Sequence, residues 1–121
     1  MVTHNLSFPK ARRLTHTAEF ERVRKEGKVW KGSLVTLVVA PAQTSETMMR
    51  AGIIASRKAG HAVVRNRARR RVREIQRRHQ HEIKSGVWLV TIISARAARA
   101  GYRELEDEWL RLAGRASILT P

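Results

Sequence analysis

The chain has 121 residues, of which 42% are hydrophobic, and this size fits one compact domain. It contains no cysteine, which excludes disulfides, thiolate metal sites and cysteine nucleophiles. Its 25 Lys and Arg residues against 10 Asp and Glu residues leave a net charge of +15, which favours a polyanionic partner. No apolar run approaches the roughly 18 residues of a membrane-spanning helix, and the N-terminus lacks a secretory apolar segment, so we expect no membrane partner and a cytoplasmic location.

The first predicted helix follows a basic arm. Residues 1–14 show no periodicity and end in a run rich in Lys and Arg, so we expect them to form this arm. Thr15 or Thr17 is of a type that caps helices, and Gly27 is a natural C-terminal stop. Between them apolar residues, including Phe20, share one face, which predicts an amphipathic helix that ends near residue 26.

Three segments rich in β-branched and apolar residues predict strands. The first two cover residues 34–40 and 51–56, and we expect residues 42–49 between them to form a mobile hairpin loop. The third segment, residues 87–94, is almost continuously apolar, which indicates a central strand buried on both faces.

Two further helices are predicted from apolar stripes at helical spacing. The first runs over residues 62–83, and the second runs over about residues 102–112, before a loose tail at 114–121. The order is then helix, strand, strand, helix, strand, helix, which indicates an α+β fold with helices packed on a small mixed sheet in a single domain, residues 1–121. The stripes consist of Val64, Ala68, Val72, Ile75 and His79, and of Tyr102, Leu105, Trp109 and Leu112.

The segment 57–73 carries eight Lys and Arg residues and no acid. Like charges at i,i+4 spacing oppose a helix by about 0.2–0.5 kcal/mol per pair, so an external polyanion is expected to compensate. A solvated charged face, the ordinary alternative, usually mixes both signs. Most of these arginines lie opposite the apolar stripe, where their planar forks suit phosphate oxygens, and Asn66 suits a base edge or a ribose 2′-hydroxyl. This outward face consists of Arg65, Asn66, Arg69, Arg70, Arg73 and Arg77.

The run Arg-Asn-Arg-Ala-Arg-Arg-Arg-Val-Arg-Glu at residues 65–74 is similar to the signature of the bacterial ribonuclease P protein family. Residues 52–64 resemble the strand and turn before that signature, and the resemblance extends over roughly residues 12–115. It implies a small two-layer sandwich with a left-handed β-α-β crossover, against the usual right-handed rule. It also implies an RNA-binding protein that assists a catalytic RNA in removing the 5′ leader of precursor tRNA.

The resemblance implies a cleft for the single-stranded leader and a separate surface for the RNA subunit. Phe20 matches an aromatic residue that lines the cleft, and Arg13 matches a basic residue at its edge. Arg24 stands where members often carry a second aromatic residue, and an aliphatic residue near Val38 replaces another, so leader binding is expected to rely more on charge. Trp30 is either a further stacking platform for the leader or a strand-edge aromatic residue. Residues that match the surface for the RNA subunit are Arg57, Lys58, Arg65, Asn66, Arg67, Arg69, Arg70 and Arg73.

The implied partners are ribonuclease P RNA and the precursor tRNA leader, with magnesium bound mainly by the RNA and no obligate protein partner. No catalytic side chain and no metal site are expected in the protein. The acids at positions 104 and 106–108 are predicted to form a solvated face of an amphipathic helix. His79 and His81 are two residues apart, which does not suit metal ligation from one helical face, so we expect surface histidines.

Two other functional classes fit parts of the sequence. A structural RNA-binding protein, such as a small ribosomal protein, fits the composition and the charge equally well. A DNA-binding protein with an arginine-rich helix in the major groove fits the predicted strands poorly. Phe20 taken alone is more often a core residue than a ligand platform, and the family resemblance favours the platform.

Overall fold

The computed structural model describes residues 7–43 and 48–121, which form a four-stranded sheet and three α-helices. The sheet order is β1-β2-β4-β3, with β3 and β4 parallel and the other two pairs antiparallel, so the expected α+β class and mixed sheet are confirmed. Within these residues no helix is long and apolar enough to cross a membrane. The elements are α1 (Thr17–Glu26), β1 (Lys28–Lys31), β2 (Val35–Pro41), β3 (Arg50–Ala55), α2 (Ala62–His79), β4 (Val87–Ile93) and α3 (Tyr102–Arg115).

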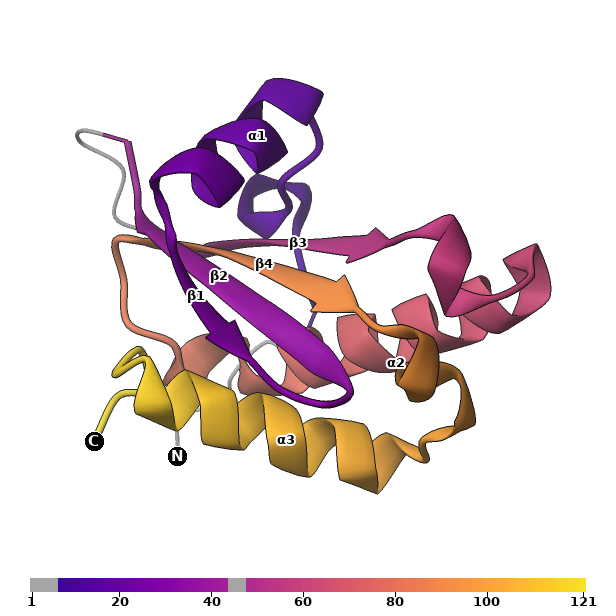
Figure 1. Ribbon diagram of the computed structural model, residues 1–121. Coiled ribbons are helices and arrows are strands. Elements are labelled where there is room, and N and C mark those ends of the chain that lie inside the picture. The colour runs from indigo at the N-terminus through magenta and orange to yellow at the C-terminus, as the bar shows by residue number, and fades with distance from the viewer. Residues whose placement is uncertain (1–6, 44–47) are drawn as a thin grey trace.

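The helices cover both faces of the sheet. Figure 1 shows α1 on one face and α2 with α3 on the other, so the sandwich has a helical layer on each side where two layers were expected. The reason lies in β4, whose Leu89 packs toward α2 and α3 while Val90 packs toward α1. The connection from β3 through α2 to β4 has the left-handed sense that the family resemblance implies (Figure 1).

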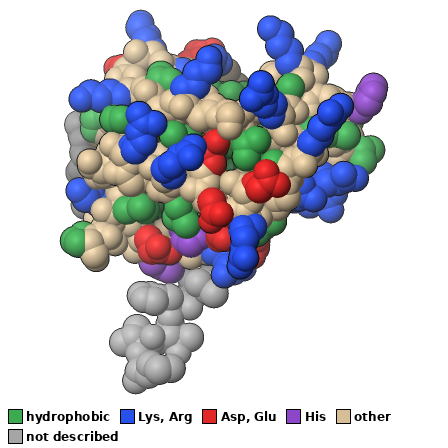
Figure 2. All heavy atoms as spheres, turned by 60° about the horizontal axis from the view of Figure 1, so that its bottom comes forward, with side chains coloured by type: hydrophobic (Ala, Val, Ile, Leu, Met, Phe, Trp, Pro, Cys, Tyr) green, Lys and Arg blue, Asp and Glu red, His purple; other side chains and the backbone are tan. Residues whose placement is uncertain are grey.

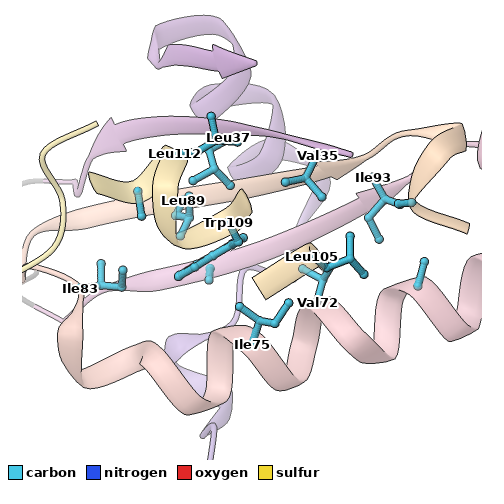
Figure 3. Close-up of a cluster of buried hydrophobic side chains, with 14 of the residues drawn as sticks. Val35, Leu37, Val72, Ile75, Ile83, Leu89, Ile93, Leu105, Trp109 and Leu112 are labelled. Atoms are coloured by element: carbon cyan, nitrogen blue, oxygen red, sulfur yellow. The ribbon is translucent and has the colours of Figure 1, made fainter. Parts of the chain in front are cut away.

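The larger core lies between the sheet and the helices α2 and α3 (Figure 3). Trp109 of α3 is almost completely buried at its centre, and its indole Nε1 donates a hydrogen bond to Thr91 Oγ1 of β4 at 3.1 Å. Val72 and Ile75 of α2 are fully buried in the same core, which confirms the apolar stripe predicted for this helix. With this apolar stripe packed in the core, the opposite side of α2 faces solvent.

The order of the strands differs from the expected one in two ways. β1 was not predicted, because Lys28–Lys31 is only four residues long and has Lys at both ends. β2 and β3 do not pair, since β4 lies between them and hydrogen-bonds to both. Their connection is therefore not the expected hairpin loop, and residues 44–47 of it lie outside the described residues.

Two helix ends also differ from the prediction. α1 begins at Thr17 with His16 as its N-cap, in place of Thr15 or Thr17. The Glu19 carboxylate accepts hydrogen bonds from the backbone N–H groups of Thr15 and His16, both at 2.9 Å, as the glutamate of a capping box does. α2 ends at His79, earlier than the expected residue 83, because the chain continues as a 3-10 helix over Gln80–Glu82.

Both ends of the described chain are packed, although the sequence predicts a basic arm and a loose tail. Phe8 is 7% exposed, and Arg13 forms a parallel bridge with Ala51 of β3; residues 1–6 of the arm lie outside the described residues. In the tail, Ile118 is buried and Leu119 bridges Ile83. The apolar side chains at both ends reach the main core, which explains the difference.

Candidate RNA-binding cleft and arginine helix

A cleft runs along the free edge of β3, between α1 and α2. It contains a cavity of about 250 Å³, whose lining includes Phe20 of α1, Gly52 and Ile53 of β3, and Arg69 and Arg73 of α2. Gly52 has no side chain, so the Phe20 ring lies directly on the strand. The cleft therefore joins an aromatic ring, a strand edge and two arginines.

The side chain of Phe20 also lines a second cavity of about 400 Å³, on the α1 side of β3, together with Arg24 and Arg69. Arg13 lies in the first cavity. The structure thus brings Arg13, Phe20 and Arg24 together, as the sequence predicts for a leader cleft. The Phe20 ring is half-buried. It packs against the core on the α1 side, as a core residue does, and it also lines the cavities, as a ligand platform does.

Trp30 lies elsewhere. It belongs to β1, at the opposite edge of the sheet from β3, and packs against the larger core with the Arg115 guanidinium 6.0 Å from its ring centroid. Of the two readings of Trp30, the strand-edge aromatic residue matches this position. The predicted leader contact of Trp30 is not part of the cleft.

A hollow of about 310 Å³ on α2 is lined by Asn66, Arg69, Arg70 and Arg73. Within residues 7–43 and 48–121, none of these four side chains has a hydrogen-bond or ion-pair partner. The same holds for Arg65, which is half-buried beside them. Arg69 lines this hollow and both cavities of the cleft, so the arginine face and the cleft are continuous.

Three other arginines of α2 have partners in the fold. Arg71 donates to the Ala100 carbonyl at 2.5 Å, and Arg78 lies within 3.9 Å of the Glu106 carboxylate. Arg77 was expected on the outward face, but it hydrogen-bonds to Glu74, and this bond holds the pKa of the Glu74 carboxyl below its ordinary value. Arg65, Arg69, Arg70 and Arg73 therefore have no partner within residues 7–43 and 48–121, whereas Arg71, Arg77 and Arg78 are held by contacts within the fold.

The remaining predicted residues lie around the start of α2. Arg57 and Lys58 are exposed in a 3-10 helix, Arg57–Ala59, between β3 and α2. Gly60 follows with φ +115°, a conformation that favours glycine. Arg67 is exposed but lies outside the hollow; it is one turn before Arg71, on the side of the helix that faces the segment after β4. Of the eight predicted RNA-subunit residues, four line the hollow on α2, and Arg57, Lys58 and Arg67 are exposed outside it.

The family model described as Ribonuclease P matches residues 8–117, which is most of the chain. The chain belongs to the ribonuclease P protein family. This membership makes it a subunit of an endoribonuclease and implies an RNA-binding role in tRNA processing.

Relatives and solved structures agree with this assignment. The ribonuclease P protein component of Chloroflexus aggregans is 38% identical over 112 residues, covering 92% of this chain and 82% of its own. That of Dehalococcoides mccartyi is 38% identical over 89% of this chain and 87% of its own. The structure of the Thermotoga maritima RNase P protein superposes with a TM-score of 0.75 at 29% identity, covering 85% of this chain and 96% of its own. The Staphylococcus aureus RNase P protein, with a TM-score of 0.81 at 23% identity over 92% of this chain and 100% of its own, shares the fold.

The cleft also contains residues that the sequence analysis missed. Phe8 lines the first cavity, but it lies in an aperiodic stretch that gives no sign of this role. Gln76 also lines the first cavity, although the residue is only 2% exposed. Gln76 lies four residues after Val72 on the apolar stripe of α2, and a polar residue on a buried stripe could have indicated a special role.

The predicted solvated acidic face of α3 is wrong at Glu108. This carboxylate is 6% exposed and accepts hydrogen bonds from the backbone N–H groups of Ser33, Leu34 and Val35 at 3.2, 2.7 and 2.8 Å. The sequence gives no sign of this partner, because the turn that supplies the N–H groups is more than 70 residues away. Glu108 therefore joins α3 to the β1–β2 connection.

His79 is not the surface histidine that was expected, since only 15% of its side chain is exposed. Its Nδ1 lies 2.5 Å from Glu82 and its Nε2 lies 2.8 Å from Glu106, while the ring stacks on Trp109 with centroids 6.2 Å apart. The hydrogen bond from His79 holds the pKa of Glu106 below its ordinary value. Acidic side chains gather on this α2–α3 face, with Lys and Arg around them (Figure 2).

Proposed function

We propose that the chain binds the ribonuclease P RNA through α2 and the preceding basic turn, and binds the single-stranded 5′ leader of precursor tRNA in the cleft beside β3. The observation that carries this proposal is the continuity at Arg69. This unpartnered arginine lines both the hollow of the arginine helix and the cavities around Phe20. A protein bound to the RNA subunit through α2 can therefore bind the leader strand in the adjoining cleft.

The unpartnered arginines explain the affinity for RNA. A guanidinium that has no acid nearby gains charge-assisted hydrogen bonds from phosphate oxygens without giving up an internal ion pair. Arg70 and Arg73 are exposed and have no partner in residues 7–43 and 48–121. Each phosphate that they neutralise also releases counterions, which makes binding dependent on salt. Asn66, exposed in the same hollow, adds a donor and an acceptor for a 2′-hydroxyl or a base edge.

The cleft explains how the protein would favour precursor over product. Precursor and mature tRNA differ by the leader, so contacts made only to the leader strengthen precursor binding alone. The Phe20 ring offers a stacking surface, while Arg13 and Arg24 lie where leader phosphates would pass. Arg24 takes the place of a second stacking residue, so charge supplies part of this binding.

Cleavage itself is assigned to the RNA subunit, with magnesium bound mainly by that RNA. The described residues contain no group of three or more His, Asp or Glu side chains that could hold a metal ion. In this proposal the protein acts in the cytoplasm with two RNA partners and needs no protein partner and no membrane.

The test is to add the purified chain to ribonuclease P RNA in limiting magnesium and to measure cleavage of precursor tRNA. We expect the protein to restore cleavage and to tighten binding of precursor more than binding of mature tRNA. A structural RNA-binding protein would bind the RNA without this preference for precursor. Absence of any stimulation by the folded protein would contradict the proposed function.

A further inference from the structure

One arginine joins two of the segments that line the cleft. Arg50 is the first residue of β3, and only 15% of its side chain is exposed. Its Nη1 lies 2.5 Å from the Glu19 carboxylate of α1, and its Nη2 donates to the Arg13 carbonyl at 2.8 Å. Within the described part of the chain, other residues line the two cavities of the cleft, so Arg50 meets a ligand there only through its neighbours.

Glu19 transmits this contact to Phe20. Its Oε1 accepts hydrogen bonds from the backbone N–H groups of Thr15 and His16, while its Oε2 meets Arg50. Burial raises the pKa of the Glu19 carboxyl, but these three hydrogen bonds outweigh burial and hold the pKa below its ordinary value. The pair with Arg50 is therefore ionised at neutral pH. Phe20 is the next residue of the helix, so any shift of Glu19 carries the ring with it.

The apolar contacts of α1 do not by themselves fix where the ring lies along β3. Among the described residues of α1, only Val23 is fully buried, and Phe20 is half-buried. Apolar burial has no direction, which leaves a helix with so few such contacts free to shift along the strand. Arg50 and Gly52 lie on the same face of β3, because strand side chains alternate. Glu19 meets the first of them and Phe20 the second, so the ion pair sets the point at which the ring reaches Gly52.

The indole of Trp88 holds the guanidinium in this bridging orientation. The guanidinium carbon of Arg50 lies 4.9 Å from the Trp88 ring centroid, and Trp88 is buried in the core on the α1 side. A planar guanidinium held over a ring presents its two amino groups in fixed directions, which a lysine ammonium cannot reproduce. One amino group is directed to Glu19, and the other to the backbone of Arg13, whose side chain lines the first cavity.

We propose that Arg50 is a positioning residue of the cleft, whose guanidinium fixes α1, with Phe20, relative to the N-terminal segment, with Arg13. This inference rests on the proposed function, because the two positioned side chains are those assigned to the leader. Arg50 acts on the leader through them alone. It therefore contributes to the preference for precursor over mature tRNA without touching either RNA.

The experiment measures the affinity of the holoenzyme for precursor and for mature tRNA. Arg50→Met removes both polar contacts and should lower the preference for precursor by about three- to tenfold, a part of what the stacking of one base is worth. In a chain that already carries Phe20→Ala and Arg13→Ala, the same substitution should have almost no further effect. A residue that acts through those two side chains has nothing left to position, which a double-mutant cycle detects.

Arg22→Met is the matched control, because Arg22 lies over the same Trp88 ring, with its guanidinium carbon 5.0 Å from the centroid. Its side chain is 19% exposed, pairs with Glu26 at 2.9 Å and donates to the Pro41 carbonyl at 2.6 Å. This variant loses as many printed polar contacts as Arg50→Met, but none of them involves Glu19 or Arg13. We expect Arg22→Met to destabilise the fold about as much and to leave the preference for precursor near its natural value.

Glu19→Gln is a second variant in case Arg50→Met does not fold. It keeps an acceptor for the N–H groups before α1 but removes the charge that pairs with Arg50, so it should lower the preference by a smaller factor. A natural preference in either folded variant would overturn the proposal. So would an equal loss in Arg22→Met, or an undiminished effect of Arg50→Met in the chain without Phe20 and Arg13. The proposed function fails separately: if Phe20→Ala leaves the preference unchanged, the cleft does not hold the leader at all.

Discussion

A Cβ atom at Gly52 would lie 2.5 Å from Cε1 of the Phe20 ring and 3.1 Å from Leu14 Cβ. Cβ atoms essentially never approach other atoms as closely as 2.5 Å, so the ring occupies the space that any other residue would need. Gly52 is required here by close approach and not by its backbone conformation, because its φ is not positive. The position of the Phe20 ring in the cleft thus depends on the absence of a side chain on β3.

Gly52→Ala should displace the Phe20 ring and reduce the preference of the holoenzyme for precursor over mature tRNA. Overpacking of this kind costs roughly 1–3 kcal/mol of stability. The two affinities and a urea titration measure both effects. Gly114→Ala is the control: its Cβ would meet Leu119 at an ordinary 3.9 Å, within helix α3, and should stabilise the protein slightly. An unchanged preference in a folded Gly52→Ala variant would show that the ring position does not matter for leader binding.

Phe20 and Arg24 should differ in how salt affects their contributions. Stacking of one base is worth about 1–3 kcal/mol and depends little on salt, so Phe20→Ala should lose up to that much precursor affinity at every ionic strength. Arg24 is exposed and acts through charge, so Arg24→Ala should lose more affinity at low salt than at high salt. Comparison of precursor with mature tRNA at two salt concentrations cancels general packing defects. Equal salt dependence of the two variants would argue against a charge role for Arg24.

Replacing Arg70 and Arg73 together with Ala should weaken binding to the RNA subunit and leave the fold intact, because neither side chain has a partner in the described part of the chain. The slope of log affinity against log salt should fall by about one unit for each lost phosphate contact. Arg78→Ala is the control, since Arg78 lies beside Tyr102 and Glu106. A double variant with the natural slope would place the RNA on another face.

Glu108→Ala should destabilise the protein by about 3 kcal/mol or more, because the backbone N–H groups of Ser33, Leu34 and Val35 would lose a charged acceptor. Glu108→Gln keeps one acceptor oxygen and should cost less. Chemical unfolding measures both. A solvated glutamate would cost almost nothing, so a change within about 0.5 kcal/mol would refute the buried role.

The pair of His79 and Glu106 should make stability depend on pH in the acidic range. The pKa of Glu106 is lowered in the folded protein, chiefly by the hydrogen bond from His79. Its stabilising contribution is therefore present above 4.5, its unperturbed value, and is lost as the pH falls below 4.5 through the folded pKa. Glu106→Gln should show a smaller drop in unfolding free energy over that range than the natural chain. Glu21→Gln, at an exposed residue of α1 with no partner in the described chain, should behave like the natural chain.

The sequence by itself determined the features that depend on neighbours along the chain. The 3.6-residue period predicted α2 and its buried stripe, and the same geometry set the arginines on the other sides of that helix. Three strands were predicted to within one residue at each end, because a strand rich in β-branched residues is a local pattern. The acid-free arginine run of α2 identified the family, and the family match over residues 8–117 confirmed it.

Only the tertiary structure decided what depends on partners far apart in sequence. The pairing of β4 with both β2 and β3, the burial of Glu108 beside a turn more than 70 residues away, and the position of Trp30 at the far edge of the sheet all follow from that packing. Gln76 is the clearest case: its spacing placed it near the core, but only the tertiary structure shows that its partners are Gly52 and Thr91. Periodicity reports which face a residue lies on, whereas the partner it meets there is set by the way the whole chain folds.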